Sequence, residues 1–404
     1  MPSRITSHLG KTPPFKLLKL CPKECRWPAS CHWRNMRYFR KLPENWHPPH
    51  CPNPNCKFHK PLPDGFPCKK DGSFTRKSDN RRIQRFLCLA CGRSFSTQTF
   101  SITYWLKIPT LPIETFSKFT GAMSNRQLAT DLKLHPNTID NLQARIARHC
   151  FLFHARQMVK TNPPAAVVVD GFVSFELSQY YPFQHHIAVE KGTDFFCYFT
   201  DSETRRSGKM TDQQKKRRQQ LEAKNGRPDP QAVRKDMTEL LQVTLSGRKS
   251  ATVYSDAHKA YPKAIRAVEC DVTHLVTSGK EHRDRNNNLW EVNLTDLQIR
   301  HYGSNHKRET IAWSKRRQGS AERMGIFLVF KNYVKPRRVK QPRGPTPAME
   351  RGMLARRLEV EELFQGRIFR DHVDLPPRWA EYYDRLVETR ALGRNRRHEL
   401  KYAR

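Results

Sequence analysis

The chain has 404 residues and carries 74 Lys and Arg against 38 Asp and Glu, a formal net charge of +36. Its basic residues are spread over the whole length, so the expected partner is a polyanion. Nucleic acid is favoured over a membrane, because no apolar run approaches the roughly 20 residues that a spanning helix needs.

Residues 1–50 are rich in Pro, Trp, Lys and Arg and follow no helical or strand periodicity, which predicts an extended basic arm. Lysines interrupt the first apolar run, so no signal peptide is recognised and a cytoplasmic protein is expected. In a reducing compartment the eleven cysteines are expected to bind metal or stay free. Within the arm, Cys21, Cys25 and Cys31 with His32 form either a second metal site or free thiols.

Two close cysteine pairs dominate residues 51–100. Pro and Asn make the turn within the first pair, and Gly92 follows the second. A thiolate pair on each side of a loop matches the tetrahedral coordination of Zn²⁺ by four cysteines. The predicted structural zinc ligands are Cys51, Cys56, Cys88 and Cys91. We therefore predict a zinc ribbon, with a short strand at 85–87 leading into the second pair and His59 as an alternative ligand to Cys56.

Helical patterns take over in residues 112–157. Ser124 to Gln127 form a capping box for a short helix that ends near Asp131, and Pro136 opens a second helix. With a supporting helix at 113–119, this predicts a helix-turn-helix DNA-binding domain, and a small helical bundle linking two domains is the alternative. The polar residues expected to face outward are Asn137, Thr138, Asp140, Asn141 and Gln143. The predicted DNA contacts of this helix are Asn137, Thr138, Asn141 and Arg145.

The pattern changes to short β-rich runs in residues 163–335, which predicts an α/β domain. The expected strands are 165–169, 186–189, 195–200 and 251–255, with a helix at 232–244 before the last. A charged insert at 209–227 is too polar for the core. Residues 336–404 read as a basic tail, in which helices are expected at 348–364 and 378–392.

Two acidic residues each follow a buried strand of this domain. Asp170 and Asp256 would meet at the rim of the sheet if their strands are neighbours. Carboxylates packed that closely repel each other unless a divalent cation neutralises them, which predicts Mg²⁺ or Mn²⁺. A third acid is expected from a later helix. Glu322 is the predicted one, because it leads into an apolar helix, and Glu309 is the alternative.

The order of cysteine ribbon, helix-turn-helix and three acids resembles the bacterial insertion-sequence transposases of the DDE class, over about residues 51–335. The similar segments are Val169 to Phe172, Tyr254 to Tyr261, and Asn305 to Thr310 with Arg316 and Arg317 before Glu322. The resemblance implies an RNase H-like catalytic domain that transposes its own element within a bacterial cell, close to the nucleoid. The basic insert and the long tail depart from the pattern.

This reading predicts metal-dependent cleavage and joining of double-stranded DNA by a homo-oligomer assembled on that DNA. The further candidates for contact with the scissile region are His258, Arg308, Arg316 and Arg317. Two other functions remain open. One is a DNA-binding regulator on a scaffold that has lost catalysis, and the other is a metal-dependent nuclease without strand transfer.

Overall fold

The computed structural model describes residues 46–62, 65–77 and 79–396. The predicted basic arm, including Cys21, Cys25, Cys31 and His32, lies outside these residues except for its last five positions. No helix in the described ranges is long and apolar enough to cross a membrane.

The cysteine-rich region forms a small antiparallel sheet. Its elements are β1 (Cys68–Thr75), β2 (Arg82–Cys88), β3 (Ser94–Ser96) and the 3-10 helix η1 (Thr97–Phe100), in the sheet order β1-β2-β3. Phe86 and Phe95 stack at 5.8 Å between ring centroids and form a core with the buried cysteines. So small a core gains from a bound metal, because zinc contributes folding free energy directly.

Three helices follow, as predicted. They are α1 (Leu111–Thr120), α2 (Asn125–Asp131) and α3 (Pro136–Met158). Ser124 caps α2 through the predicted capping box with Gln127, and Pro136 occupies the first turn of α3. The structure extends α3 far beyond a recognition helix, to 23 residues, and most of its later residues are buried.

A five-stranded mixed sheet forms the centre of the next region. Its strands are β4 (Ala166–Phe175), β5 (Pro182–Glu190), β6 (Phe196–Glu203), β7 (Ser250–Asp256) and β8 (Asp271–Thr277), in the order β6-β5-β4-β7-β8. β5 is antiparallel to β4 and β6, whereas β7 is parallel to β4 and β8. The four predicted strands are confirmed and longer than expected, and β8 was not predicted.

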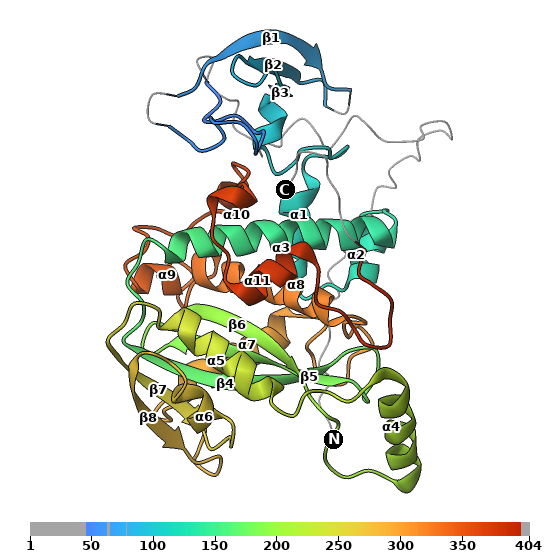
Figure 1. Ribbon diagram of the computed structural model, residues 1–404, viewed down its shortest axis with the longest axis vertical. Helices are drawn as coiled ribbons and strands as arrows, with labels where there is room; N and C mark the ends of the chain where they lie inside the picture. The colour runs from blue at the N-terminus through green and yellow to red at the C-terminus, as the bar shows by residue number, and fades with distance from the viewer. Residues whose placement is uncertain (1–45, 63–64, 78, 397–404) are drawn as a thin grey trace, which may run out of the picture. The chain divides into compact units, whose positions relative to one another are not determined.

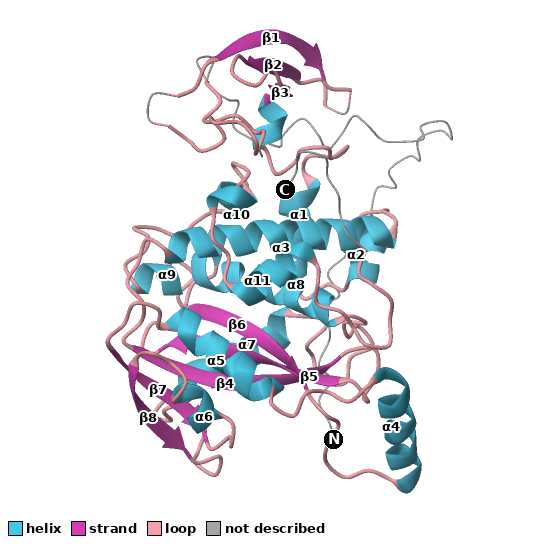
Figure 2. Ribbon diagram, in the orientation of Figure 1, coloured by secondary structure: helices cyan, strands magenta, loops and turns pink. Residues whose placement is uncertain are grey.

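Helices cover both faces of this sheet (Figures 1 and 2). On one face lie α5 (Ala232–Thr244) and α6 (Tyr261–Ile265); on the other lie α7 (Trp290–Tyr302) and α8 (Arg317–Val329), which continues into the π-helical turn η2 (Phe330–Val334). Helix α3 packs along α8, and a Cβ at Gly325 would collide with the Phe151 ring, so glycine is needed for this close approach. The region of α1, α2 and α3 is thereby joined to the sheet region by a continuous buried contact.

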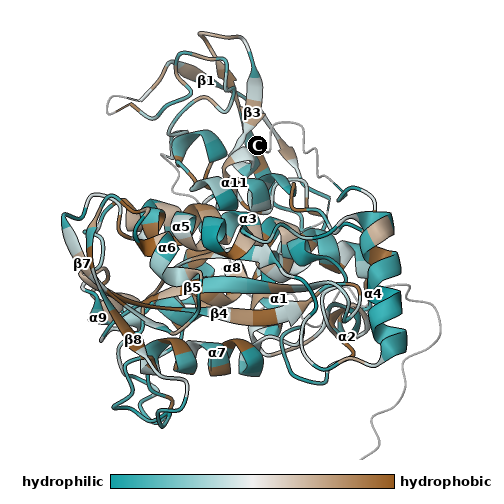
Figure 3. Ribbon diagram, turned by 60° about the horizontal axis from the view of Figure 1, so that its bottom comes forward, coloured by the Kyte–Doolittle hydropathy of each residue, from teal (hydrophilic) through white to brown (hydrophobic). Residues whose placement is uncertain are grey.

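The predicted insert contains α4 (Asp212–Asn225), which has no buried residue and is largely hydrophilic in Figure 3. This agrees with its exclusion from the core.

The predicted tail differs from expectation. Its elements are α9 (Pro347–Glu350), α10 (Val360–Leu363), η3 (Arg370–His372) and α11 (Pro377–Asp384).

The long helices expected at 348–364 and 378–392 are therefore wrong in extent. The tail follows the buried surface of α3 and the sheet instead of forming its own core. Trp379 is 1% exposed and donates a hydrogen bond to the carbonyl of Phe199 at 3.0 Å. Phe364 is fully buried against Phe116 of α1.

Candidate active site and metal centres

Asp170 and Asp256 lie side by side. The parallel pairing of β4 with β7 places Val168 opposite Tyr254, and each aspartate is two residues further along its strand. Side chains two residues apart project to the same face of a strand, so both carboxylates leave the sheet at the same place. The register brings the two acids together as predicted, but Asp170 lies within β4, which continues to Phe175, and not at the end of its strand.

The environment of the Asp170 carboxyl group disfavours a negative charge. Burial raises its pKa to about 6, and the charge of Asp256 adds to the shift, while a hydrogen bond from the Gly171 amide at 2.7 Å and the guanidinium of Arg283 oppose it. No side-chain ion pair within 4.0 Å neutralises Asp170 or Asp256 in the described part of the chain. Such a pair of acids is suited to a divalent cation.

A third acid, Asp296 on α7, faces this pair. Burial raises the pKa of Asp296 well above its ordinary value, and the negative charge of Asp170 raises it further. Its Oδ1 atom is inaccessible to solvent and makes no hydrogen bond to any residue that the structure describes. Both strand aspartates and Asp296 also raise the pKa of the buried Tyr261 hydroxyl, so that side chain borders all three acids.

The three carboxylates do not form as tight a group as the cysteines. Their oxygens do not all lie within 4.8 Å of one another, as the ligand atoms of the cysteine cluster do. The charge of Asp256 acts on Asp170, and the charge of Asp170 acts on Asp296. Asp296 was missed by the sequence reasoning, because it lies inside a helix and follows no strand.

Glu322, the predicted third ligand, is not part of this group. It is 2% exposed, forms a 3.0 Å ion pair with Arg385, and accepts a hydrogen bond from Gln143 of α3 at 2.9 Å. Ser320, two residues earlier on α8, contacts His185 of the sheet at 2.9 Å. Residues two apart on a helix are separated by roughly 200°, so Glu322 points away from the sheet. The alternative, Glu309, is exposed on the loop before α8.

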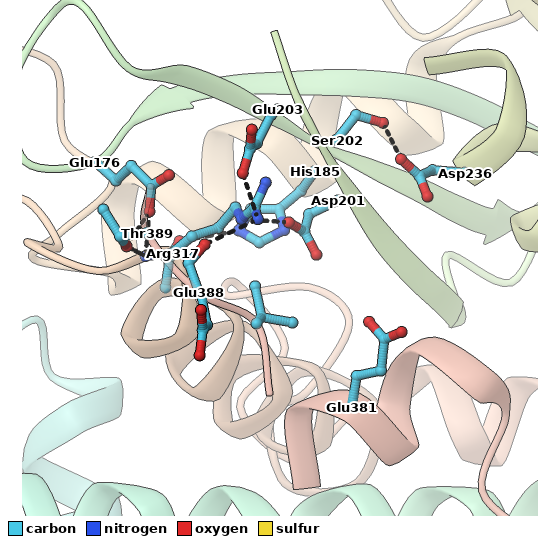
Figure 4. A network of polar contacts seen from close by, with 12 residues as sticks. Glu176, His185, Asp201, Ser202, Glu203, Asp236, Arg317, Glu381, Glu388 and Thr389 are labelled. Atoms are coloured by element: carbon cyan, nitrogen blue, oxygen red, sulfur yellow. Dashed lines mark hydrogen bonds and ion pairs between the residues drawn. The ribbon is translucent and has the colours of Figure 1, made fainter. Parts of the chain in front are cut away.

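The position of Arg317 also differs from the prediction. It was expected to contact DNA, but it is 6% exposed and forms ion pairs with Asp201 at 3.0 Å and Glu203 at 2.9 Å. Figure 4 shows its guanidinium enclosed by these acids, with Glu176 and Thr389 beside its backbone. An arginine with both ends committed to buried partners positions α8 on the sheet and is not available to phosphate.

The four predicted zinc ligands come together. Cys51 Sγ lies 3.6 Å from Cys91 Sγ, Cys56 Sγ lies 3.9 Å from Cys88 Sγ, and all four sulfurs lie within 4.8 Å of one another. A buried four-cysteine cluster of this kind could hold zinc. His59 does not replace Cys56, because Cys56 completes the four-sulfur group and the His59 ring lies in a separate group with His50 and His372.

No protein-family model and no curated protein matches the chain. Among solved structures, it is similar to a chain described as "CryoEM structure of simian T-cell lymphotropic virus intasome in complex with PP2A regulatory subunit B56 gamma". That match has 12% sequence identity and covers 61% of this chain and 74% of the other, with a TM-score of 0.22. A TM-score this low leaves the function to be inferred from the side chains.

The other predicted DNA contacts fall into two groups. Asn137, Thr138 and Asn141 lie on the first turns of α3, and their side chains make no hydrogen bond to any described residue. Gln143, which was expected to face outward, and Arg145, a predicted DNA contact, are both engaged within the protein. Gln143 is buried against Glu322, and Arg145 donates to the carbonyls of Ile102 and Tyr104, both at 2.8 Å.

Around the carboxylates, the structure leaves His258 and Arg308 exposed. The His258 amide donates to Asp256 Oδ1 at 3.1 Å, so this residue directly borders the acids. Arg308 is near enough to Arg300 to lower its pKa, after the larger effect of burial. Arg316 is less free, since it donates to the Gly393 carbonyl at 2.6 Å.

Proposed function

We propose that this chain is a DNA transposase of the DDE class, which binds the ends of its own insertion element and catalyses metal-dependent strand cleavage and strand transfer. The observation that carries the proposal is the placement of Asp170 and Asp256 side by side on the adjacent parallel strands β4 and β7, with Asp296 facing them from α7. We assign these three acids as the catalytic set, with Asp296 in the place expected for Glu322.

The sheet supports an RNase H-like scaffold for this set. The strands occur along the chain as β, β, β, α, β, α, β, the second strand is antiparallel, and the fourth lies beside the first. That arrangement is the one expected of an RNase H-like sheet. It also explains why the two strand acids meet, because the first and fourth strands are neighbours that run parallel.

The residues fit a divalent metal centre. Three carboxylates offer only oxygen ligands, and an all-oxygen set favours Mg²⁺ or Mn²⁺ over zinc. The pKa of Asp170 is raised, and Asp296 Oδ1 makes no hydrogen bond to a described residue. A bound cation would stabilise the negative charge on both carboxylates. Two bound ions of this type would activate the attacking water or 3′-hydroxyl and stabilise the leaving oxygen.

Cationic side chains at the same rim have the chemistry to position DNA phosphates. Arg283 is exposed and influences both Asp170 and Asp296. Arg300 lies one turn after Asp296 on α7 and covers the Phe172 ring at 4.4 Å. Arginines at the edge of an acidic centre can hold phosphate oxygens while the acids hold metal, which keeps the scissile bond in place.

Recognition of the element ends is assigned to the first turns of α3, where Asn137, Thr138 and Asn141 have free polar side chains. The net charge of +36 supplies affinity for any DNA. Zinc in the four-cysteine cluster is assigned a structural role. The proposal includes a homo-oligomer on DNA, since two element ends must be processed together.

The test uses full-length protein and DNA made from the sequences that flank its gene, with Mg²⁺ or Mn²⁺ added. Asp170→Asn, Asp256→Asn and Asp296→Asn should each reduce cleavage and joining by roughly 100-fold or more, since even outer-shell changes around metals cost 10 to 100-fold. A double variant should be hardly worse than a single one, because the ligands act as a unit. Binding of Mn²⁺ should be lost in parallel.

Two glutamates provide matched controls. Glu309→Gln changes an exposed acid and should leave activity intact. Glu322→Gln should lower the free energy of unfolding, because it leaves Arg385 buried without its partner, yet it should retain Mn²⁺ binding. Loss of Mn²⁺ binding in Glu322→Gln but not in Asp296→Asn would reverse the assignment. Cleavage without joining would indicate a nuclease, and end-specific binding without cleavage would indicate a regulator.

A further inference from the structure

Three histidines from distant parts of the chain meet beside the cysteine cluster. His50 and His59 flank the first cysteine pair, and His372 ends η3, 313 residues after His59. One ring nitrogen of each lies within 4.8 Å of those of the other two. His50 and His59 are 3% and 7% exposed, so two of the three rings are removed from water.

Backbone carbonyls fix one nitrogen of each ring. His50 Nδ1 lies 3.1 Å and His59 Nδ1 lies 2.9 Å from the Cys51 oxygen, and His372 Nε2 lies 3.0 Å from the His59 oxygen. A carbonyl oxygen only accepts, so each of these nitrogens carries the proton. In a neutral imidazole the opposite nitrogen then has a free lone pair. Carbonyl acceptors orient metal-bound histidines in the same way.

One of the free nitrogens is buried and lacks a hydrogen-bond partner. His59 Nε2 is inaccessible to solvent and makes no hydrogen bond within the described residues. Its nearest charged neighbour is Asp371 Oδ2 at 3.3 Å, which is close but outside hydrogen-bond geometry. An unsatisfied buried polar atom costs about 1–3 kcal/mol, so a site built this way needs a further partner.

We propose that His50, His59 and His372 form a second zinc site, with Asp371 as the nearest available anionic ligand. Imidazole and carboxylate ligands in a set of four suit tetrahedral Zn²⁺. This site is separate from the four-cysteine cluster and shares no ligand with it, although the Cys51 carbonyl orients two of its rings. Its role is structural, because it ties the segment before α11 to the ribbon.

Existing contacts show what such a metal would reinforce. The Arg367 amide donates to the Phe100 carbonyl at 2.8 Å, and the His50 ring lies 4.7 Å from that of Phe369. Packing of aromatic rings is the competing explanation of the cluster, since His50 also contacts Phe100 at 5.2 Å. Packing alone, however, leaves His59 Nε2 without a hydrogen bond beside the Asp371 carboxylate, whereas a metal ion would bind both groups.

The experiment measures zinc per chain in the full-length protein and the ligand set of Co²⁺ after exchange. Cysteine thiolates give intense sulfur-to-cobalt charge-transfer bands, and a site of imidazoles and a carboxylate gives only ligand-field bands. The wild-type chain should bind one Co²⁺ equivalent that adds no charge-transfer intensity. Thiols in the first 45 residues cannot produce that signature.

Variants locate the ion. His372→Ala and His59→Ala should each release one zinc equivalent while leaving the charge-transfer bands unchanged, which also shows that the ribbon remains folded. His372→Cys should restore the equivalent and add a thiolate band. The matched control is His47→Ala, an exposed histidine three residues before His50, which should release nothing. A wild-type protein whose every Co²⁺ ion carries thiolate bands would overturn the proposal, whatever the variants do.

Discussion

Two sets of acids on the same face of the sheet have opposite surroundings. Asp201 on β6 is fully buried, and burial alone would raise its pKa, but Arg378 at 2.9 Å and Arg317 at 3.0 Å hold that pKa well below its usual range. Asp170 on β4 is less buried, yet burial raises its pKa to about 6, the charge of Asp256 adds to the rise, and no ion pair with a described residue offsets it. The two aspartates differ in partners far more than in burial.

The difference separates acids that build the fold from acids that await a ligand. A buried carboxylate with two guanidiniums is complete within the chain, and removing one partner leaves a buried charge uncompensated. A group of carboxylates without a counter-ion is incomplete, and a divalent cation would stabilise it. Glu322 belongs to the first kind and Asp296 to the second, which is why we propose Asp296 as the third ligand instead of Glu322.

The largest effect is expected where a complete set is broken. Arg317→Gln should lower the free energy of unfolding by about 3–5 kcal/mol, because Asp201 and Glu203 lose a buried cationic partner. The neighbouring Arg316→Gln is the matched control. It loses only contacts to residues near the end of the chain and should cost far less. Denaturant unfolding measures both, and equal losses would mean that burial of Arg317 is not what holds α8 on the sheet.

The incomplete set should respond in the opposite direction. The folded-state pKa of Asp170, about 6, lies above its ordinary value of 3.8. Its favourable contribution to stability is therefore present below about pH 4 and is lost as the pH rises through about 6. Asp170→Asn should thus stabilise the metal-free protein by roughly 2 kcal/mol at pH 8 and by almost nothing at pH 4.

Bound metal should reverse the stability difference between the wild type and Asp170→Asn. Mg²⁺ or Mn²⁺ at pH 8 should raise the melting temperature of the wild type and leave Asp170→Asn unchanged, because only the wild type retains the full ligand set. Asp201→Asn gives the contrast: it should destabilise the protein at pH 8, and added metal should still stabilise it. A wild type that is indifferent to both ions would end the distinction between the two sets.

Local patterns were enough to predict much of the fold. The capping box at Ser124, Pro136 at the start of a helix, and the cysteine pairs each depend on residues close in sequence, and the structure has all of them. The aliphatic runs before Asp170 and Asp256 predicted the strands for the same reason. Strand β8 was missed because its residues are mostly polar and exposed, as befits an edge strand.

Contacts between distant residues could not be predicted in this way. Glu322 was chosen because an apolar helix follows it, but which face of α8 meets the sheet depends on Arg385, Gln143 and the tail. Asp296 offered one weak signal, an acid followed by Leu297 and Ile299 in a helical stretch. Arg385 and Gln143 are far from Glu322 in the sequence, and residue spacing does not reveal such distant partners of a buried charge.

The distinction between satisfied and free polar groups also applies to α3, where the smallest effect is expected. Arg145 is engaged by two backbone carbonyls, whereas the side chains of Asn137 and Asn141 make no hydrogen bond to described residues. Asn137→Ala or Asn141→Ala should weaken binding to the element ends by about 1 kcal/mol or somewhat more for each lost base contact. Binding to random DNA, and its steep salt dependence of about −0.9 per phosphate contact in log–log slope, should not change.

Arg145→Ala should instead lower the melting temperature while preserving the preference for end DNA over random DNA. Titrations of both DNAs at several salt concentrations separate these outcomes, and an equal loss on both DNAs in the asparagine variants would mean that α3 contacts the backbone and does not read bases.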